Sequence, residues 1–272
     1  MISSKNLIEG VATMINKEAR YNELIEKVKR SYLLNPNDLT WCDDCKEINL
    51  WTYWQGRGNL DAKILLVGQD WGAPDEPEAE NVMKNIRLMN AGVSVPYMKG
   101  NFNPTDQTLI RLFHSIGYDI AADSADNHDL FFTNLVLGYR SGKISGGLQQ
   151  KWIEHDSDFF GELVSIIEPK TILCLGKDTF IGVLKALKLP TPKIKRYNDY
   201  LDQQRKPIVF QHDSGEAAGV FALAHCGVLG SLNRNRGYAE KCNNISRQMN
   251  DWNKVSIWNS PEKIRKTNDS AY

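Results

Sequence analysis

The sequence has few cysteines, no excess of either charge and no long apolar run. Its five cysteines are an odd number spread over 272 residues, which does not form a disulfide framework and indicates a reducing, cytoplasmic location. No apolar run approaches the about 20 residues that cross a bilayer, and residues 1–30 lack the apolar core of an export signal. The 33 basic and 33 acidic side chains balance, although partners respond to local potential rather than to the sum.

What the chain does contain is an ordinary globular composition with alternating strand and helix patterns. Apolar residues make up 42% and charged residues 24%, which excludes disorder, collagen and coiled coil. Apolar runs ended by glycine or polar residues predict buried strands, and amphipathic stretches between them predict helices. Such alternation indicates βαβ crossovers and a parallel sheet covered on both faces. The predicted strands are 63–67, 129–136, 171–175, 219–224 and, more weakly, 207–210; the predicted helices are 105–116, 152–167, 179–187 and 238–252.

The patterns also predict how the chain is divided. Residues 1–58 form an N-terminal helical extension with an aromatic segment, and helical spacing predicts either two amphipathic helices there or one broken near Arg20. Residues 59–252 form one α/β domain, and residues 253–272 form a loosely held tail. We expect a monomer.

Three polar side chains follow predicted strands at one edge of the sheet. Asp70 follows the first strand, Asn134 ends the second and His225 follows the last. In an open α/β sheet, ligands bind at the carboxyl ends of the strands. Each residue alone also fits a helix cap, a turn or a structural histidine. Together they offer a carboxylate, a two-way hydrogen-bonding amide and a polarising imidazole.

The segments that carry these residues resemble the uracil-DNA glycosylase superfamily. They read LLVGQDWG (65–72), LFFTNLVLGYRSG (130–142) and AHCGVLGSLNRNRG (224–237), where archetypal members have GQDPYH, LLLNxVLTV and HPSPLS followed by RG. The resemblance covers roughly residues 60–250 and is that of a divergent member. It implies a three-layer α/β/α sandwich around a four-stranded, mainly parallel sheet, and excision of uracil or a related deaminated base from DNA.

The resemblance also implies a role for each matched residue. Trp71 stands where the archetype excludes the thymine methyl, so that exclusion falls to Trp71 or is relaxed. Leu229 stands at the position of the DNA-intercalating leucine, with Leu232 as the alternative. The implied catalytic residues are Asp70 and His225; those that bind the substrate base are Gln69, Trp71, Phe102 and Asn134; those that contact DNA are Leu229, Leu232, Arg234 and Arg236.

This chemistry requires no metal or organic cofactor. Cys42 and Cys45 form a CxxC pair, which is half of a zinc or iron–sulfur site. The iron–sulfur branch places a further cysteine where this chain has Gly138, so we expect two free thiols. Two other functions remain open: a superfamily member that binds DNA or a nucleobase without excising it, and a nucleotide-binding protein with phosphates at Gly176–Lys177. The latter lacks a phosphate-loop pattern.

Overall fold

The computed structural model shows an α/β protein with an N-terminal helix. It describes residues 4–34, 39–40, 60–72, 104–118, 120, 129–140, 148–237 and 244–259. Seven helices and eight strands lie in these described segments. In chain order they are α1 (Ser4–Leu34), β1 (Leu39–Thr40), β2 (Ile64–Gly68), β3 (Trp71–Gly72), α3 (Pro104–Ser115), β4 (Leu130–Asn134), β5 (Tyr139–Arg140), α4 (Gln150–Ile167), β6 (Thr171–Leu175), α5 (Lys177–Ala186), α6 (Tyr197–Gln203), β7 (Ile208–Gln211), β8 (Ala217–Leu223), α7 (Val228–Asn235) and α8 (Ser246–Asn259).

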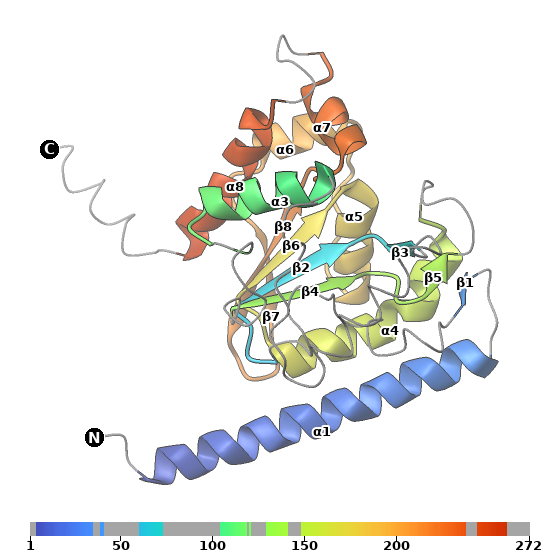
Figure 1. Ribbon diagram of the computed structural model, residues 1–272, viewed down its shortest axis with the longest axis vertical. Helices are drawn as coiled ribbons and strands as arrows, with labels where there is room; N and C mark the ends of the chain where they lie inside the picture. Colours follow the sequence, from blue (N-terminus) through green and yellow to red (C-terminus); the bar gives the residue numbers. More distant parts are fainter. Residues whose placement is uncertain are drawn as a thin grey trace, which may run out of the picture.

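A five-stranded sheet forms the centre of the molecule (Figure 1). Its strands lie in the order β4-β2-β6-β8-β7, and all neighbours are parallel except β7, which runs antiparallel to β8. The expectation of four strands is therefore wrong by one, because the weak apolar run at 207–210 forms an edge strand. Alternate residues of β7 are exposed, as is usual for an antiparallel strand with one solvated face.

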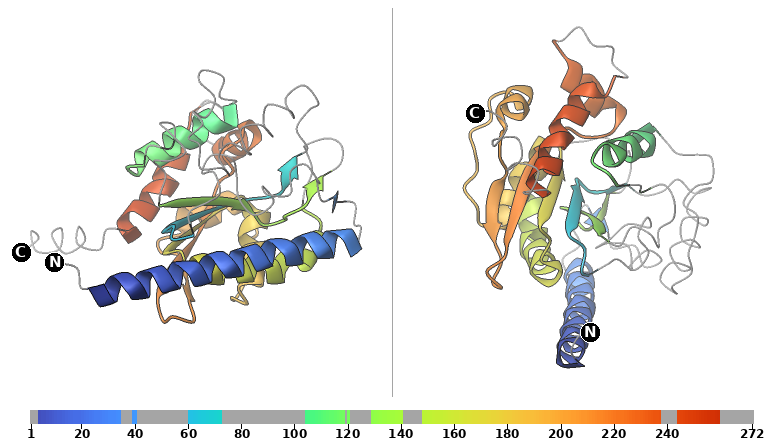
Figure 2. Two further views of the ribbon diagram at one scale, coloured as in Figure 1. Left: turned by 60° about the horizontal axis from the view of Figure 1, so that its bottom comes forward. Right: turned by 90° about the vertical axis from the view of Figure 1, so that its left-hand side faces the viewer.

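Helices cover both faces of this sheet (Figure 2). The side chains of Leu65 and Val67 enter a core formed with α1, α4 and α5. Those of Ile64 and Leu66 enter a second core formed with α3 and α8. Because successive side chains of a strand point to opposite faces, a continuous apolar strand such as β2 needs a cover on each side.

Helix α1 is continuous through Arg20, so the expected break there is wrong. The Arg20 guanidinium donates to Ser165 Oγ on α4 at 2.9 Å, and this contact supports the helix at that point. Tyr21, Leu24 and Val28, spaced at helical intervals, are fully buried against the sheet and α4. The helix thus contributes to the main core. Neither α1 nor another helix in the described segments is long and apolar enough to cross a membrane.

The structure has further elements outside the predicted strands and helices. A small sheet in the order β1-β5-β3 places Trp71–Gly72 beside Tyr139–Arg140. Helices α6 and α7 also lie outside the predicted elements; α7 contains Gly230, a poor helix former. The last helix ends at Asn259 rather than at Trp252, because Val255 continues its buried face; residues 238–243 of the predicted helix lie outside the described segments.

Candidate functional site

The first two predicted site segments lie side by side at the carboxyl edge of the sheet. Strands β2 and β4 pair in parallel up to their last residues, Gly68 opposite Asn134. Beyond the strands, the Leu135 N–H donates to the Gly68 carbonyl at 3.0 Å and the Val136 N–H to the Gln69 carbonyl at 3.1 Å. The chain that leads from Gly68 to Asp70 is therefore bonded to the chain that leaves Asn134.

The position of the Asn134 side chain explains why glycine stands at position 68, before Gln69 and Asp70. Its side chain is almost fully buried, with 6% exposed. A Cβ atom at Gly68 would lie 2.1 Å from Asn134 Oδ1, which is closer than any side chain tolerates. Only glycine at position 68 leaves room for the carboxamide. The Asn134 amide therefore packs directly against the backbone of Gly68, two residues before Asp70.

His225 is fixed by contacts on both its ring and its backbone. The Gly227 N–H donates to His225 Nδ1 at 2.9 Å, and Gln248 Nε2 donates to the His225 carbonyl at 3.0 Å. A Cβ at Gly230 would lie 2.0 Å from that carbonyl oxygen, so glycine is required where α7 passes the histidine. Since Nδ1 accepts a hydrogen bond, the neutral imidazole carries its proton on Nε2.

The charge state of His225 is set by its surroundings. Burial among protein atoms lowers the pKa of the imidazole below its ordinary 6.5, and the negative charge of Asp70 acts in the opposite direction. The net shift is downward although the residue as a whole is exposed. His225 is therefore neutral at pH 7, and Asp70 is near enough for its charge to be felt at the ring.

Two predicted base-contacting side chains lie outside the described part of the structure. Phe102 belongs to an undescribed segment, and Trp71 is described only through its backbone in β3. Gln69 and Asp70 are partly buried. The described chain resumes at Pro104, and Thr105 Oγ1 would lie 3.3 Å from a Cβ at Gly227, so the start of α3 borders the His225 turn.

Helix α7, which carries the expected wedge leucines, presents apolar side chains to solvent. Leu229 is 70% exposed, Val228 56% and Leu232 38%. Val228 and Leu232 also line a hollow of about 270 Å³ between α7 and α3. Exposed apolar side chains that cluster on one short helix indicate a contact surface. Leu229, the more exposed of the two predicted leucines, is the better placed to enter a partner.

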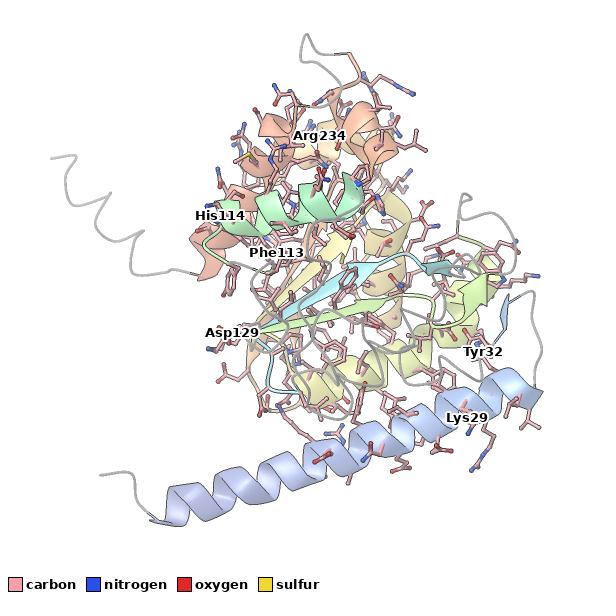
Figure 3. All side chains as sticks on the ribbon, viewed as in Figure 1. Lys29, Tyr32, Phe113, His114, Asp129 and Arg234 are labelled. Carbon is pink, nitrogen blue, oxygen red and sulfur yellow. The ribbon has the colours of Figure 1, made fainter. Side chains whose placement is uncertain are left out.

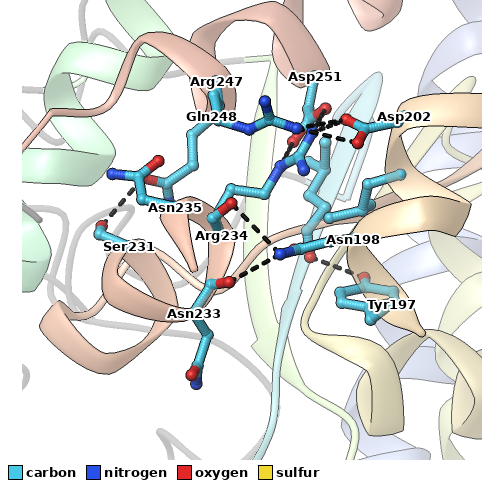
Figure 4. A network of polar contacts seen from close by, with 12 residues as sticks. Tyr197, Asn198, Asp202, Ser231, Asn233, Arg234, Asn235, Arg247, Gln248 and Asp251 are labelled. Atoms are coloured by element: carbon cyan, nitrogen blue, oxygen red, sulfur yellow. Dashed lines mark hydrogen bonds and ion pairs between the residues drawn. The ribbon is translucent and has the colours of Figure 1, made fainter. Parts of the chain in front are cut away.

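Arg234, in contrast, is a buried structural residue (Figure 4). It is 3% exposed, and its Nε and Nη2 donate to both oxygens of the Asp251 carboxylate at 2.8 and 2.9 Å. Nη2 also donates to Asp202 at 2.7 Å. The buried Asp251 and the exposed Asp202 thus hold the guanidinium in place, which gives Arg234 a structural role; the expectation that it contacts DNA stays a prediction.

Arg236 belongs to a basic cavity of about 390 Å³ beside His225. Lys177 at the start of α5 and Arg196 before α6 also line it, with the polar side chains of Asn198 and Asn233. These three cationic residues are exposed, and the buried Arg234 also forms part of the wall. No local sequence motif indicates this cavity, because its charged residues come from three separated segments. The one signal in the sequence was the position of Lys177 directly after the end of a predicted strand.

The described residues contain no group of three or more histidine, cysteine, aspartate or glutamate side chains that could hold a metal ion. Cys174 and Cys226 are buried free thiols, and burial raises the pKa of Cys226 to about 12. Cys42 and Cys45 lie outside the described segments. At Gly138, a Cβ would lie 2.4 Å from the Tyr32 ring, so a cysteine ligand at this position would displace Tyr32.

Comparison with models of known protein families gives no match, and neither does comparison with curated protein sequences. The role of this site must therefore be inferred from its residues and their geometry. Those residues are an acid, an amide and a neutral imidazole at one sheet edge, flanked by the exposed face of α7 and the basic cavity.

The opposite environments of Arg234 and Arg236 predict different effects on stability. Arg234→Ala should lower the free energy of unfolding by about 3–5 kcal/mol, because it leaves the buried Asp251 carboxylate without its main partner. Arg236→Ala should change it by less than about 0.5 kcal/mol, as is usual for an exposed residue. Urea unfolding of both variants measures the difference. Equal stabilities would contradict the structural role of Arg234.

Proposed function

We propose that the protein is a DNA glycosylase that hydrolyses the N-glycosidic bond of uracil or a related deaminated base flipped out of DNA. The observation that carries the proposal is the Gly227 N–H bond to His225 Nδ1, because it leaves an Nε2–H donor on a neutral ring beside Asp70. Bond cleavage builds negative charge on the leaving base and positive charge on the sugar. A preorganised donor stabilises the first and a carboxylate the second.

Asn134 supports the choice of base. A carboxamide offers one acceptor and two donors, so it can accept from uracil N3–H while donating to O4. Cytosine presents the opposite pattern, and a buried polar group left unpaired costs about 1–3 kcal/mol. The close packing of the Asn134 carboxamide against Gly68 supports a fixed orientation of this amide. Discrimination between the two bases requires such a fixed orientation. We infer a preference for uracil-like over cytosine-like edges.

The features beside the site support DNA as the substrate. An enzyme that acts on a base must take it out of the stack, and Leu229 on α7 offers an exposed apolar wedge near His225. Lys177, Arg196 and Arg236 offer cations for neighbouring phosphates in the basic cavity, since phosphate contacts dominate affinity for nucleic acid. In this proposal the fold corresponds to the α/β/α sandwich of the uracil-DNA glycosylase superfamily, with β7 as an added edge strand.

Substitution of the central residues tests the proposal. Asp70→Asn and Asn134→Ala should each reduce excision at least about 100-fold, since a single preorganised catalytic contact is worth this much. Asp213→Asn, an exposed aspartate of a turn, is the matched control and should behave as the unaltered protein. The assay uses single- and double-stranded oligonucleotides with uracil, hypoxanthine, xanthine or thymine opposite guanine, and alkaline cleavage at abasic sites.

The assay separates the alternatives. Full activity in both variants would contradict the site assignment. An unaltered protein that binds these oligonucleotides but releases no base from any of them would favour the alternative function, a superfamily member that binds DNA or a nucleobase without excision.

The lowered pKa of His225 predicts how stability depends on pH. The folded protein binds fewer protons at this residue than the unfolded chain between the lowered pKa and 6.5. The contribution of His225 to the free energy of unfolding is therefore complete above pH 6.5 and is lost as the pH falls toward the lowered pKa. Excision should decline over the same range, because protonation of Nδ1 displaces the Gly227 N–H. Urea unfolding in this range should show a steeper pH dependence for the unaltered protein than for His225→Gln; equal slopes would contradict the assignment.

The basic cavity predicts a salt effect on DNA binding. Lys177→Ala and Arg236→Ala should each weaken binding and reduce the slope of log affinity against log salt by about 0.7–0.9. Lys170→Ala removes an exposed lysine at the opposite end of β6 and should leave the slope unchanged. Fluorescence anisotropy with a labelled oligonucleotide measures all three. If Lys177→Ala and Arg236→Ala have salt slopes as steep as that of the unaltered protein, the cavity does not bind DNA phosphates.

A further inference from the structure

A buried polar cluster lies where the end of α1 meets α4, away from the catalytic side chains. Asp156 on α4 is fully buried. Its Oδ2 accepts hydrogen bonds from the Tyr32 hydroxyl at 2.5 Å and from the Leu137 N–H at 2.7 Å, and its Oδ1 lies 2.6 Å from His155 Nδ1. Ser31 Oγ lies 2.9 Å from the other ring nitrogen of His155. Figure 3 shows Tyr32 near the end of α1, on the side of α4.

Two of these contacts reach the segment that follows Asn134. Asp156 accepts a hydrogen bond from the Leu137 N–H, and the Tyr32 side chain packs against Gly138. The Tyr32 ring also fills the space where a Gly138 side chain would be. Burial and the negative charge of Asp156 raise the pKa of Tyr32, so its hydroxyl stays protonated and remains a donor to the carboxylate.

The opposite edge of the same segment is bonded to the chain that carries Asp70. The N–H groups of Leu135 and Val136 donate to the carbonyls of Gly68 and Gln69. Residues 134–138 are thus held between the first site strand and the Tyr32–Asp156 pair. A displacement of this segment would move the Asn134 amide and the Gly68–Gln69 backbone together.

We propose that Tyr32 and Asp156 are positioning residues, which fix the Asn134 amide and its distance from Asp70 through the backbone of residues 137–138. The catalytic consequence of this inference rests on the proposed function. A buried carboxylate is costly unless several donors satisfy it. The donors to Asp156 include the Leu137 N–H, in the segment after Asn134, and the Tyr32 hydroxyl, on helix α1. Helix α1 therefore takes part in the geometry of the site as well as in the core.

Tyr32→Phe is the central variant, because it removes the hydroxyl that donates to Asp156 while keeping the ring that packs against Gly138. Its single-turnover excision rate at saturating uracil-containing oligonucleotide should fall about 10- to 100-fold, the usual effect of a misplacement near 1 Å. The affinity for the oligonucleotide should stay within about twofold, because this pair does not contact DNA. Tyr21→Phe is the control: it removes a hydroxyl from the buried face of the same helix about three turns earlier. This variant should keep the full rate.

Coupling to Asn134 separates positioning from general destabilisation. Asn134→Ala should make Tyr32→Phe nearly neutral, because a residue that acts through Asn134 has nothing left to orient. Asp156→Asn should reproduce the effect of Tyr32→Phe. Equal rates for Tyr32→Phe and Tyr21→Phe, or independent effects of Tyr32→Phe and Asn134→Ala, would overturn the inference.

Amide hydrogen exchange keeps this inference distinct from the proposed function. In Tyr32→Phe, the amides of Leu137 and Gly138 should exchange at least about tenfold faster, because local opening costs less when a hydrogen bond is removed. The same amides should be unchanged in Tyr21→Phe. If the unaltered protein excises no base, the proposed function fails, but hydrogen exchange still tests whether Tyr32 and Asp156 fix residues 137–138. Unchanged exchange in Tyr32→Phe would overturn that inference.

Discussion

The parallel pairing of β2 with β4 is the constraint on which the rest of the site depends. The two strands pair residue by residue until Gly68 faces Asn134, and hydrogen bonds continue between the chains just beyond the sheet. Because the carboxyl ends of parallel neighbours lie at the same edge of a sheet, Asp70 follows one strand at the edge where Asn134 ends the other. Glycine at position 68 makes this possible, since any Cβ would collide with the amide.

Buried charged residues support the site on two flanks. Arg234, with Asp202 and Asp251, fixes α7 to α6 and α8 on one flank. Asp156 with Tyr32 fixes the segment after Asn134 on the other. Asp156 and Asp251 each accept more than one hydrogen bond, and an unpaired buried charge is strongly destabilising. A balanced total charge is consistent with a DNA-binding function when some arginines and aspartates pair inside the protein and exposed cations gather in one cavity.

Most of the sheet and the polar edge could be predicted from the sequence, because buried strands are continuous apolar runs and their ends carry the motifs. The fifth strand is weaker in pattern, since alternate residues of this edge strand are exposed and the others are only partly buried. The continuity of α1 depends on contacts such as Arg20 with Ser165, which local spacing does not contain. The burial of Arg234 is of the same kind: its partners lie 32 and 17 residues away.

The central claim is that a neutral His225 presents an Nε2–H donor to the flipped base. Nitrogen-15 NMR of the imidazole, recorded with and without a single-stranded oligonucleotide that carries uncleavable 2′-fluoro-deoxyuridine, tests it most directly. The account predicts that near pH 7 Nδ1 is unprotonated and Nε2 protonated, and that the Nε2–H resonance shifts downfield when the oligonucleotide binds. A proton on Nδ1, or an Nε2–H resonance that does not change in the complex, would contradict it.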